Sequence, residues 1–83
     1  MKTELRKSAL KDLEQLDKPV RNKIIKEIQD LQNFPDVLNC KKLVNFDPAY
    51  RLRVGDYRVL FDIFNDIIYI ARVLHRKDAY KNK

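Results

Sequence analysis

The sequence predicts an α+β domain in which a helical hairpin packs on an antiparallel sheet of three to four strands. Two observations support this prediction: apolar residues recur at helical spacing through residues 8–31, and they alternate with polar residues in three runs through residues 49–75. Helices followed by a block of strands are typical of the α+β class. The chain has 83 residues, the size of one domain, so we predict a single domain over residues 1–83.

Composition indicates a globular protein, with 45% hydrophobic and 36% charged residues. The apolar runs are only a few residues long, so we expect neither a membrane span nor a signal peptide. Cys40 is the one cysteine and has no partner for an internal disulfide, which favours a reducing, cytoplasmic location. We interpret Cys40 as a structural thiol, with a nucleophile as the alternative.

The first half of the chain predicts a short strand and then two helices. The alternating segment Lys2–Arg6 is a candidate edge strand. Ser8 is a candidate N-cap for a helix that runs to about Leu16, with Leu10, Leu13 and Leu16 on its apolar face.

A second helix follows a short turn. Asp17 and Pro19 are a start signal, because the fixed φ of proline is tolerated in a first helical turn, and Phe34-Pro35 ends the helix. Its apolar face, which we expect to pack in the core, consists of Val20, Ile24, Ile28 and Leu31.

The second half predicts a three-stranded meander. Residues 36–49 have no clear period and are expected to form a loop. Gly55-Asp56 suits a two-residue hairpin loop of type II′, with glycine first, and Asn65-Asp66 marks the second turn. The predicted strands are Ala49–Val54, Tyr57–Phe64 and Ile67–His75.

A two-residue loop at Gly55-Asp56 fixes the register of the first hairpin. It places Arg53 opposite Arg58, and Arg51 opposite Leu60, so the three arginines share one face. The opposite face, which we expect the helices to cover, carries Tyr50, Leu52, Val54, Tyr57, Val59, Phe61 and Ile63.

Like charges directly opposite in a sheet destabilise it, by roughly 0.2–1 kcal/mol per pair. The net charge is +6, of which residues 40–83 contribute +5, with ten basic and five acidic side chains. A phosphodiester backbone gripped by forked guanidinium groups is the natural compensating partner. A merely solvated basic surface is the alternative.

A two-residue turn at Asn65-Asp66 extends the register to the last strand. It predicts that Arg58 faces Val73 and that His75 lies on the arginine face. We also expect Asp62, on that face, to hold a guanidinium group.

The layout resembles the RelE/ParE superfamily of toxins from toxin–antitoxin pairs. The similarity covers the whole chain, through the helical hairpin, the segment "CKKLVNFDPAYRLRVGDYRVLFDI" and the closing "HRKDAY". It implies a RelE-like, microbial ribonuclease-type fold. The RelE branch cleaves messenger RNA in the ribosomal A site by attack of the ribose 2′-hydroxyl, without a metal or other cofactor.

The resemblance implies catalytic roles for Arg51, Arg53, Arg58, Arg76 and Tyr80, and the chemistry and expected position of His75 add it to this group. We expect the strand arginines to neutralise charge on the phosphoryl oxygens, and His75 to transfer a proton, because an imidazole titrates near neutral pH. Arg76 would anchor the phosphate or stabilise the leaving oxygen, and Tyr80 would stack on a base or donate a hydrogen bond. Candidate RNA-binding residues are Lys41, Lys42, Lys77 and Lys81, with an exposed basic loop as the alternative for Lys41 and Lys42.

The sequence departs from the best-studied RelE members, which carry lysines at the positions of Arg51 and Arg53. Arginine does not lose its proton, so both suit electrostatic stabilisation better than proton transfer.

The resemblance also implies the partners: a cognate antitoxin protein, the ribosome and mRNA, and operator DNA only through the antitoxin complex. No membrane partner is expected. The alternative functions are a ParE-like toxin that poisons DNA gyrase without nuclease activity, and a basic binding module without catalysis.

Overall fold

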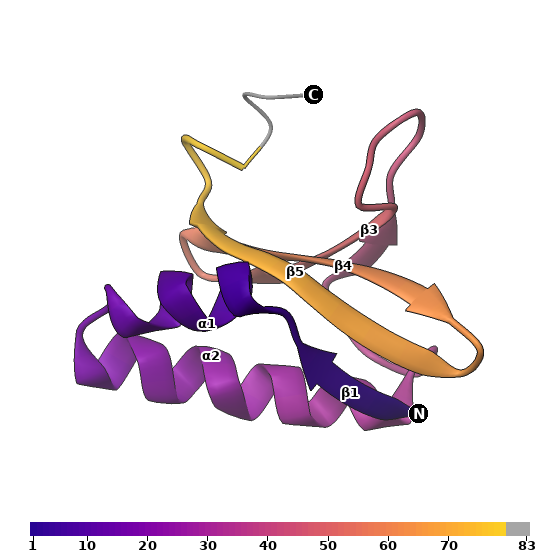
Figure 1. Cartoon of the computed structure of the whole chain (residues 1–83), viewed down its shortest axis with the longest axis horizontal. Helices are drawn as coiled ribbons and strands as arrows, with labels where there is room; N and C mark the ends of the chain where they lie inside the picture. The colour runs from indigo at the N-terminus through magenta and orange to yellow at the C-terminus, as the bar shows by residue number, and fades with distance from the viewer. Residues whose placement is uncertain (80–83) are drawn as a thin grey trace.

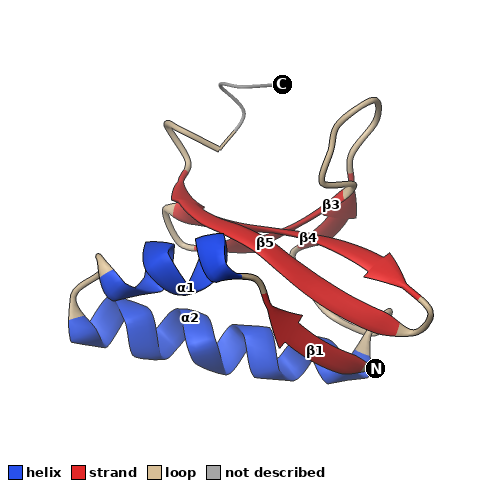
Figure 2. Ribbon diagram, viewed as in Figure 1, coloured by secondary structure: helices blue, strands red, loops and turns tan. Residues whose placement is uncertain are grey.

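The computed structural model describes residues 1–79, in which both helices lie on one side of a twisted sheet (Figures 1 and 2). Within these residues no helix is long and apolar enough to cross a membrane. The elements in chain order are β1 (Lys2–Leu5), α1 (Lys7–Glu14), α2 (Lys18–Asp30), the 3-10 helix η1 (Leu31–Asn33), β2 (Cys40–Lys42), β3 (Tyr50–Val54), β4 (Tyr57–Phe64) and β5 (Ile67–His75).

The five strands lie in the order β1-β5-β4-β3-β2. β1 runs parallel to β5, and the other neighbours are antiparallel. The α+β class and the helical hairpin on a sheet are confirmed, but the sheet is mixed and larger than expected. The additional strand is β2, in the segment predicted to be a loop, because three residues are too few for an alternating pattern to stand out.

Helix α1 differs from its prediction at both the cap and the apolar face. It begins at Lys7 with Arg6 in the N-cap position, so the assignment of Ser8 as the cap was wrong. Leu10 is 46% exposed, whereas Ala9 and Leu13 are buried. The helix therefore packs through the small side chain of Ala9, which allows a close approach to the sheet.

Helix α2 follows its prediction closely. Asp17 occupies the N-cap position, proline stands in the first turn, and Ile24 and Ile28 are buried. Leu31, also fully buried, opens η1, which ends before Phe34. The core lies between these side chains and the inner face of the sheet, to which the strands contribute Leu52, Val54, Val59, Phe61, Ile68, Ile70 and Val73.

The β3–β4 hairpin has the predicted register, with Arg53 opposite Arg58 and Arg51 opposite Leu60. Gly55 has φ +57°, and Asp56 is not in the positive-φ region, as a type II′ loop requires. The second turn, Asn65-Asp66, has positive φ at both residues, and Phe64 opposes Ile67 as predicted.

The β4–β5 ladder contains a β-bulge that the prediction missed. Phe61 pairs with Ile70 but Leu60 pairs with Arg72, so Ala71 is an extra residue in β5. Beyond the bulge every pairing shifts by one, and Arg58 opposes Leu74 instead of Val73. A shift of one residue exchanges the two faces of a strand.

Helix α1 closes the edge of β5 where β1 no longer pairs with it. The Ser8 hydroxyl donates to the Ala71 carbonyl at 2.6 Å, and the Val73 N–H donates to the Asp12 carboxylate at 2.8 Å. Ser8 and Asp12 stand one helical turn apart, so one side of α1 satisfies successive backbone groups of β5. Along the edge of β5, hydrogen bonds from the side chains of Ser8 and Asp12 thus follow the backbone hydrogen bonds of β1.

Candidate functional site

Basic side chains gather on the face of the sheet that points away from the helices. We define the basic face by the residues that cross-strand pairing puts on this side: Lys41, Arg51, Arg53, Arg58 and Arg72. The prediction that the first three strand arginines share one face is confirmed, because their neighbours Leu52, Val54 and Val59 are buried on the opposite side.

Backbone carbonyl groups orient two of these arginines. Arg51 Nη1 donates to the Asn39 carbonyl at 2.9 Å, and Arg58 Nη1 donates to the carbonyls of Gly55 and Tyr57 at 2.9 and 3.0 Å. Each guanidinium has five N–H groups, so both keep donors for a ligand. Arg53 is exposed beside them.

Carboxylates do not neutralise these three arginines within residues 1–79, where none lies within 4.0 Å of them. Asp62, expected to hold a guanidinium group, instead accepts the Ala49 N–H at 2.8 Å, so that expectation was wrong. Its carboxylate fixes the chain at the start of β3. Among residues 1–79, these three strand arginines therefore carry positive charge without a carboxylate partner.

Arg72, which the sequence reasoning did not select, is held differently. Its Nε and Nη2 donate to the two oxygens of Asp12 at 2.8 and 3.1 Å. This hydrogen bond raises the pKa of the Arg72 guanidinium. Arg72 is therefore bound to Asp12 of α1. In the sequence Arg72 alternates with apolar residues as the other strand arginines do, so the same pattern could have placed it on the basic face.

His75 does not lie on the basic face, so its predicted position was wrong. The bulge at Ala71 pairs His75 with Tyr57, whose side chain belongs to the helix side of the sheet. The two rings meet edge to face with centroids 5.4 Å apart. His75 Nδ1 accepts the Lys77 N–H at 3.2 Å, which assigns the proton of a neutral imidazole to Nε2.

The other predicted residues are distributed around the basic face. Lys41 pairs with Arg51 and lies on the basic face. Lys42 pairs with Tyr50 and places its ammonium group 5.9 Å from the centre of that ring, on the helix side. Arg76 lies beside the β3–β4 loop, with Nε 3.9 Å from the exposed Asp56 carboxylate.

Lys77 is exposed in the turn after β5. Tyr80 and Lys81 lie outside the described residues.

Cys40 belongs to β2 and is half-buried. Burial raises the pKa of its thiol, and the charge of Arg51 opposes that shift. A thiol with a raised pKa has less thiolate at neutral pH and is a weaker nucleophile. This supports the interpretation of Cys40 as a structural residue.

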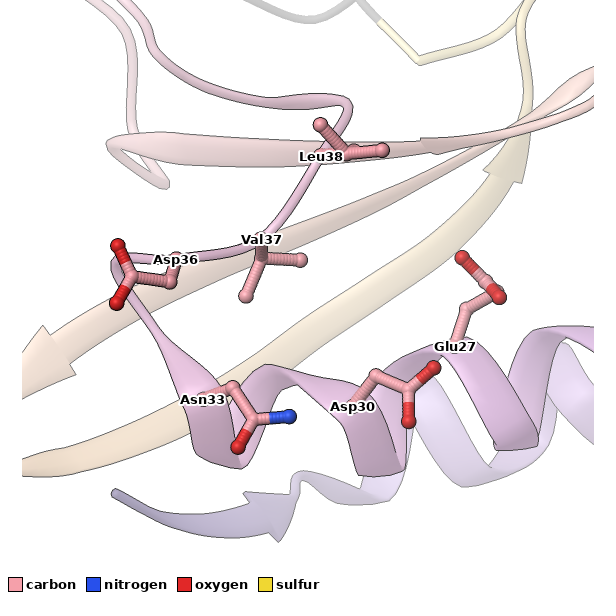
Figure 3. A pocket seen from close by; sticks show the side chains of 6 residues that line it. All are labelled: Glu27, Asp30, Asn33, Asp36, Val37 and Leu38. Atoms are coloured by element: carbon pink, nitrogen blue, oxygen red, sulfur yellow. The ribbon is translucent and has the colours of Figure 1, made fainter.

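A hollow of about 410 Å³ lies apart from the basic face, around the end of α2 and the loop after η1 (Figure 3). Three carboxylates line it, from Glu27, Asp30 and Asp36, and the side chains of Asn33, Val37 and Leu38 complete it. Its acidic lining would repel a phosphodiester backbone. The charge distribution therefore favours polyanion binding on the basic face and disfavours it here.

Comparison with known proteins gives consistent results. Residues 3–80 match the family described as ParE toxin of type II toxin–antitoxin system, parDE. Toxin RelE3 of Methanocaldococcus jannaschii is 37% identical over 84 residues, which cover 96% of each chain. A putative toxin RelE1 of the same organism is 34% identical over 95% of this chain and 93% of its own.

Among solved structures, the RelB–RelE antitoxin–toxin complex from Methanococcus jannaschii matches with a TM-score of 0.76 and 32% identity, over 95% of this chain and 96% of that one. The archaeal RelE–RelB complex from Pyrococcus horikoshii OT3 matches with the same TM-score and 25% identity, over 94% and 97%. The helices on a mixed sheet and the sequence similarity along nearly the whole chain agree. The chain therefore belongs to the RelE/ParE superfamily of type II toxin–antitoxin toxins.

Proposed function

We propose that this toxin is a metal-independent endoribonuclease that cleaves messenger RNA in the ribosomal A site and so inhibits translation and growth. The observation that carries the proposal is the pair Arg53 and Arg58, directly opposite each other and next to Arg51, with no carboxylate within 4.0 Å inside residues 1–79. A phosphate placed over these strands would receive hydrogen bonds from several guanidinium groups at once.

The proposed reaction is an internal displacement at phosphorus. The ribose 2′-oxygen attacks the adjacent phosphate and loses its proton to water, and the bond to the 5′-oxygen breaks as that oxygen gains a proton from water. The products are a 2′,3′-cyclic phosphate and a 5′-hydroxyl. Negative charge grows on the phosphoryl oxygens, where donors fixed in advance stabilise the transition state.

Arg58 and Arg51 suit this role because backbone carbonyls already orient them. Guanidinium groups do not release protons near neutral pH, so we assign them to charge stabilisation and not to proton transfer. We retain Arg76, beside the β3–β4 loop, as a phosphate anchor. Tyr80 keeps the stacking or hydrogen-bonding role that the resemblance implies.

His75 is removed from the proposed catalytic group. It pairs with Tyr57 on the helix side of the sheet, and its Nδ1 already accepts a backbone hydrogen bond. A neutral imidazole with Nδ1 occupied has no second free nitrogen to take a proton from a 2′-hydroxyl. We instead assign His75 to packing at the end of β5.

We also propose a cognate antitoxin as partner, because similar chains were solved as RelB–RelE antitoxin–toxin complexes. An acidic antitoxin segment would complement the net charge of +5 in residues 40–83 and cover the basic face. Operator DNA would then be bound through the antitoxin. The toxin would act in the cytoplasm, where ribosomes and messages are found.

Induction in cells with sequencing of new 5′ ends tests the nuclease. Wild type should arrest growth and create new 5′-hydroxyl ends inside translated messages, and Arg58→Ala should abolish both. Lys26→Ala is the matched control, because it removes an exposed positive charge from α2. Growth arrest with no new ends would contradict the proposal.

The ParE description of the matching family supports a second candidate, a gyrase poison without nuclease activity. A supercoiling assay with purified gyrase separates the two. Inhibition of supercoiling by the purified toxin, without message cleavage, would select the gyrase poison.

A further inference from the structure

The edge strand β2 directs some of its backbone groups away from the sheet. β2 is the last strand of the sheet and has β3 as its neighbour. Asn39 and Leu43, which flank β2, both hydrogen-bond to the backbone on the β3 side, at 3.0 and 2.7 Å. In an antiparallel ladder, residues that bond to the neighbouring strand alternate with residues that do not. Cys40 and Lys42 therefore point their N–H and C=O groups outward.

These outward groups have no partner in the described part of the chain. Among residues 1–79, no hydrogen bond reaches the N–H or C=O of Cys40 or Lys42. An unpaired strand edge is a template for another strand, and an extended peptide that joins it gains main-chain hydrogen bonds. The edge of β2 thus offers two donors and two acceptors to a further strand.

Apolar side chains stand at both ends of this edge. Leu38, on the loop that leads into β2, is 85% exposed, and Val44, two residues after β2, is 83% exposed (Figure 3). Single exposed apolar residues are common on protein surfaces. Here, however, a strand of about seven residues laid along β2 would reach both of them, because each residue of a strand spans about 3.3 Å.

The charge of β2 selects the kind of strand that can join it. Lys41 lies on the basic face and Lys42 on the helix side, beside Tyr50. A second copy of β2, paired antiparallel about Lys41, would place Lys41 opposite Lys41 and join two basic faces. Like charges directly opposite in a sheet are destabilising, whereas opposite charges stabilise the pair. The edge therefore favours an acidic strand over a second copy of this chain.

Resting on the antitoxin partnership proposed above, we propose that an extended acidic segment of the antitoxin pairs with β2 as a sixth strand. It places a carboxylate opposite Lys41 and apolar side chains against Leu38 and Val44. Because Lys41 pairs with Arg51, the added strand borders the basic face. Main-chain hydrogen bonds then hold the antitoxin beside the arginines that we assign to catalysis, in addition to the attraction between charges.

Amide hydrogen exchange tests the added strand without any substitution in β2. The full-length Arg58→Ala chain, labelled with 15N, is measured alone and with the purified product of the gene that adjoins the toxin gene. Alone, the outward amides of Cys40 and Lys42 should exchange rapidly, and that of Lys41, which faces β3, should exchange slowly. The complex should slow Cys40 and Lys42 by about tenfold or more, because hydrogen-bonded amides exchange slowly.

The two ways in which this experiment can fail are distinct. A complex that forms but leaves the exchange of Cys40 and Lys42 unchanged would overturn the added strand and leave the antitoxin partnership intact. No complex at all would refute the partnership, and the added strand with it.

Lys42→Pro removes one outward N–H and leaves the ladder to β3 intact, since proline is tolerated on an edge strand where its nitrogen faces solvent. Lys42→Ala is the matched control, because it removes the same side chain and keeps the N–H. By calorimetric titration, Lys42→Pro should bind the antitoxin about tenfold more weakly than Lys42→Ala, the effect of a lost main-chain hydrogen bond. Equal affinities for two variants with the same urea midpoint would overturn the proposal.

Sedimentation of the toxin alone tests the excluded occupant. The Arg58→Ala chain should sediment as a monomer. Dimers that protect Cys40 and Lys42 as the toxin concentration rises would overturn the proposal and identify a second copy as the occupant. Lys41→Glu tests the sign of the charge and should weaken antitoxin binding about fivefold or more, with a larger effect at low salt. Unchanged or tighter binding by Lys41→Glu would refute the acidic strand.

Discussion

Replacement of Asp12 by alanine measures how much the α1–β5 junction contributes to stability. Asp12 accepts the part-buried Val73 N–H at 2.8 Å and forms a two-pronged pair with Arg72. A part-buried donor left without a partner costs about 1–3 kcal/mol. The Arg72 side chain is 46% exposed, so screening by water reduces the ion pair to about 0–1 kcal/mol.

The two contributions add up to about 2.5 kcal/mol, and the better helix propensity of alanine recovers roughly 0.5 kcal/mol. Asp12→Ala should therefore lower the free energy of unfolding by about 2 kcal/mol. Asp12→Asn keeps an acceptor for Val73 and should lose about 1 kcal/mol. Arg72→Ala removes only the ion pair and should lose about 0.5 kcal/mol.

Urea unfolding of the full-length variants checks these values. For a chain of this size the dependence on urea is roughly 1 kcal/mol per molar, so Asp12→Ala should lower the midpoint by about 2 M. Glu14→Ala, an exposed acidic residue of the same helix, should stay within about 0.5 kcal/mol of wild type. Equal losses for Asp12→Ala and Arg72→Ala would refute the reasoning, because the bond to Val73 would then contribute nothing.

Three further predictions follow from the hairpin and from His75. Arg53→Ala removes the repulsion with Arg58 and should stabilise the fold by about 0.2–1 kcal/mol, more in low salt than in high salt, by urea unfolding. Gly55→Ala should lower the free energy of unfolding by about 1–2 kcal/mol, because alanine is strained at a φ of +57°. An added Cβ would meet nothing within 4 Å, so an unchanged urea midpoint would contradict the strain argument. His75→Gln should leave the cleavage map unchanged, and loss of cleavage with an unchanged unfolding midpoint would return His75 to the catalytic group.

The β3–β4 hairpin and its arginines could be predicted because the information is local. Gly55-Asp56 permits one compact loop, and that loop determines which residues oppose each other across the ladder. Alternation along two strands then separates the arginines from the buried residues. Neither step requires knowledge of the remaining chain.

The position of His75 could not be predicted, because the bulge depends on a contact distant in sequence. β5 leaves β1 at Ile70, and the next carbonyl, of Ala71, meets the Ser8 hydroxyl of α1 instead of a strand. No glycine marks the site. The residues around Ser8 predict a helix N-cap. Only the position of Ser8 beside β5 shows that its hydroxyl binds the Ala71 carbonyl instead.

The charge on the basic face is separable from the forces that fold the chain. The core draws on the helix side of β3 and β4, where Leu52, Val59 and Phe61 are fully buried. Arg51 and Arg58 add hydrogen bonds to backbone carbonyls, but the core does not depend on charge at the positions of Arg51, Arg53 and Arg58. Their repulsion costs about 1 kcal/mol at most, small beside a typical stability of about 5–15 kcal/mol. Concentrating this charge therefore costs the fold little, and the anion that we propose for this face would offset that cost when it binds.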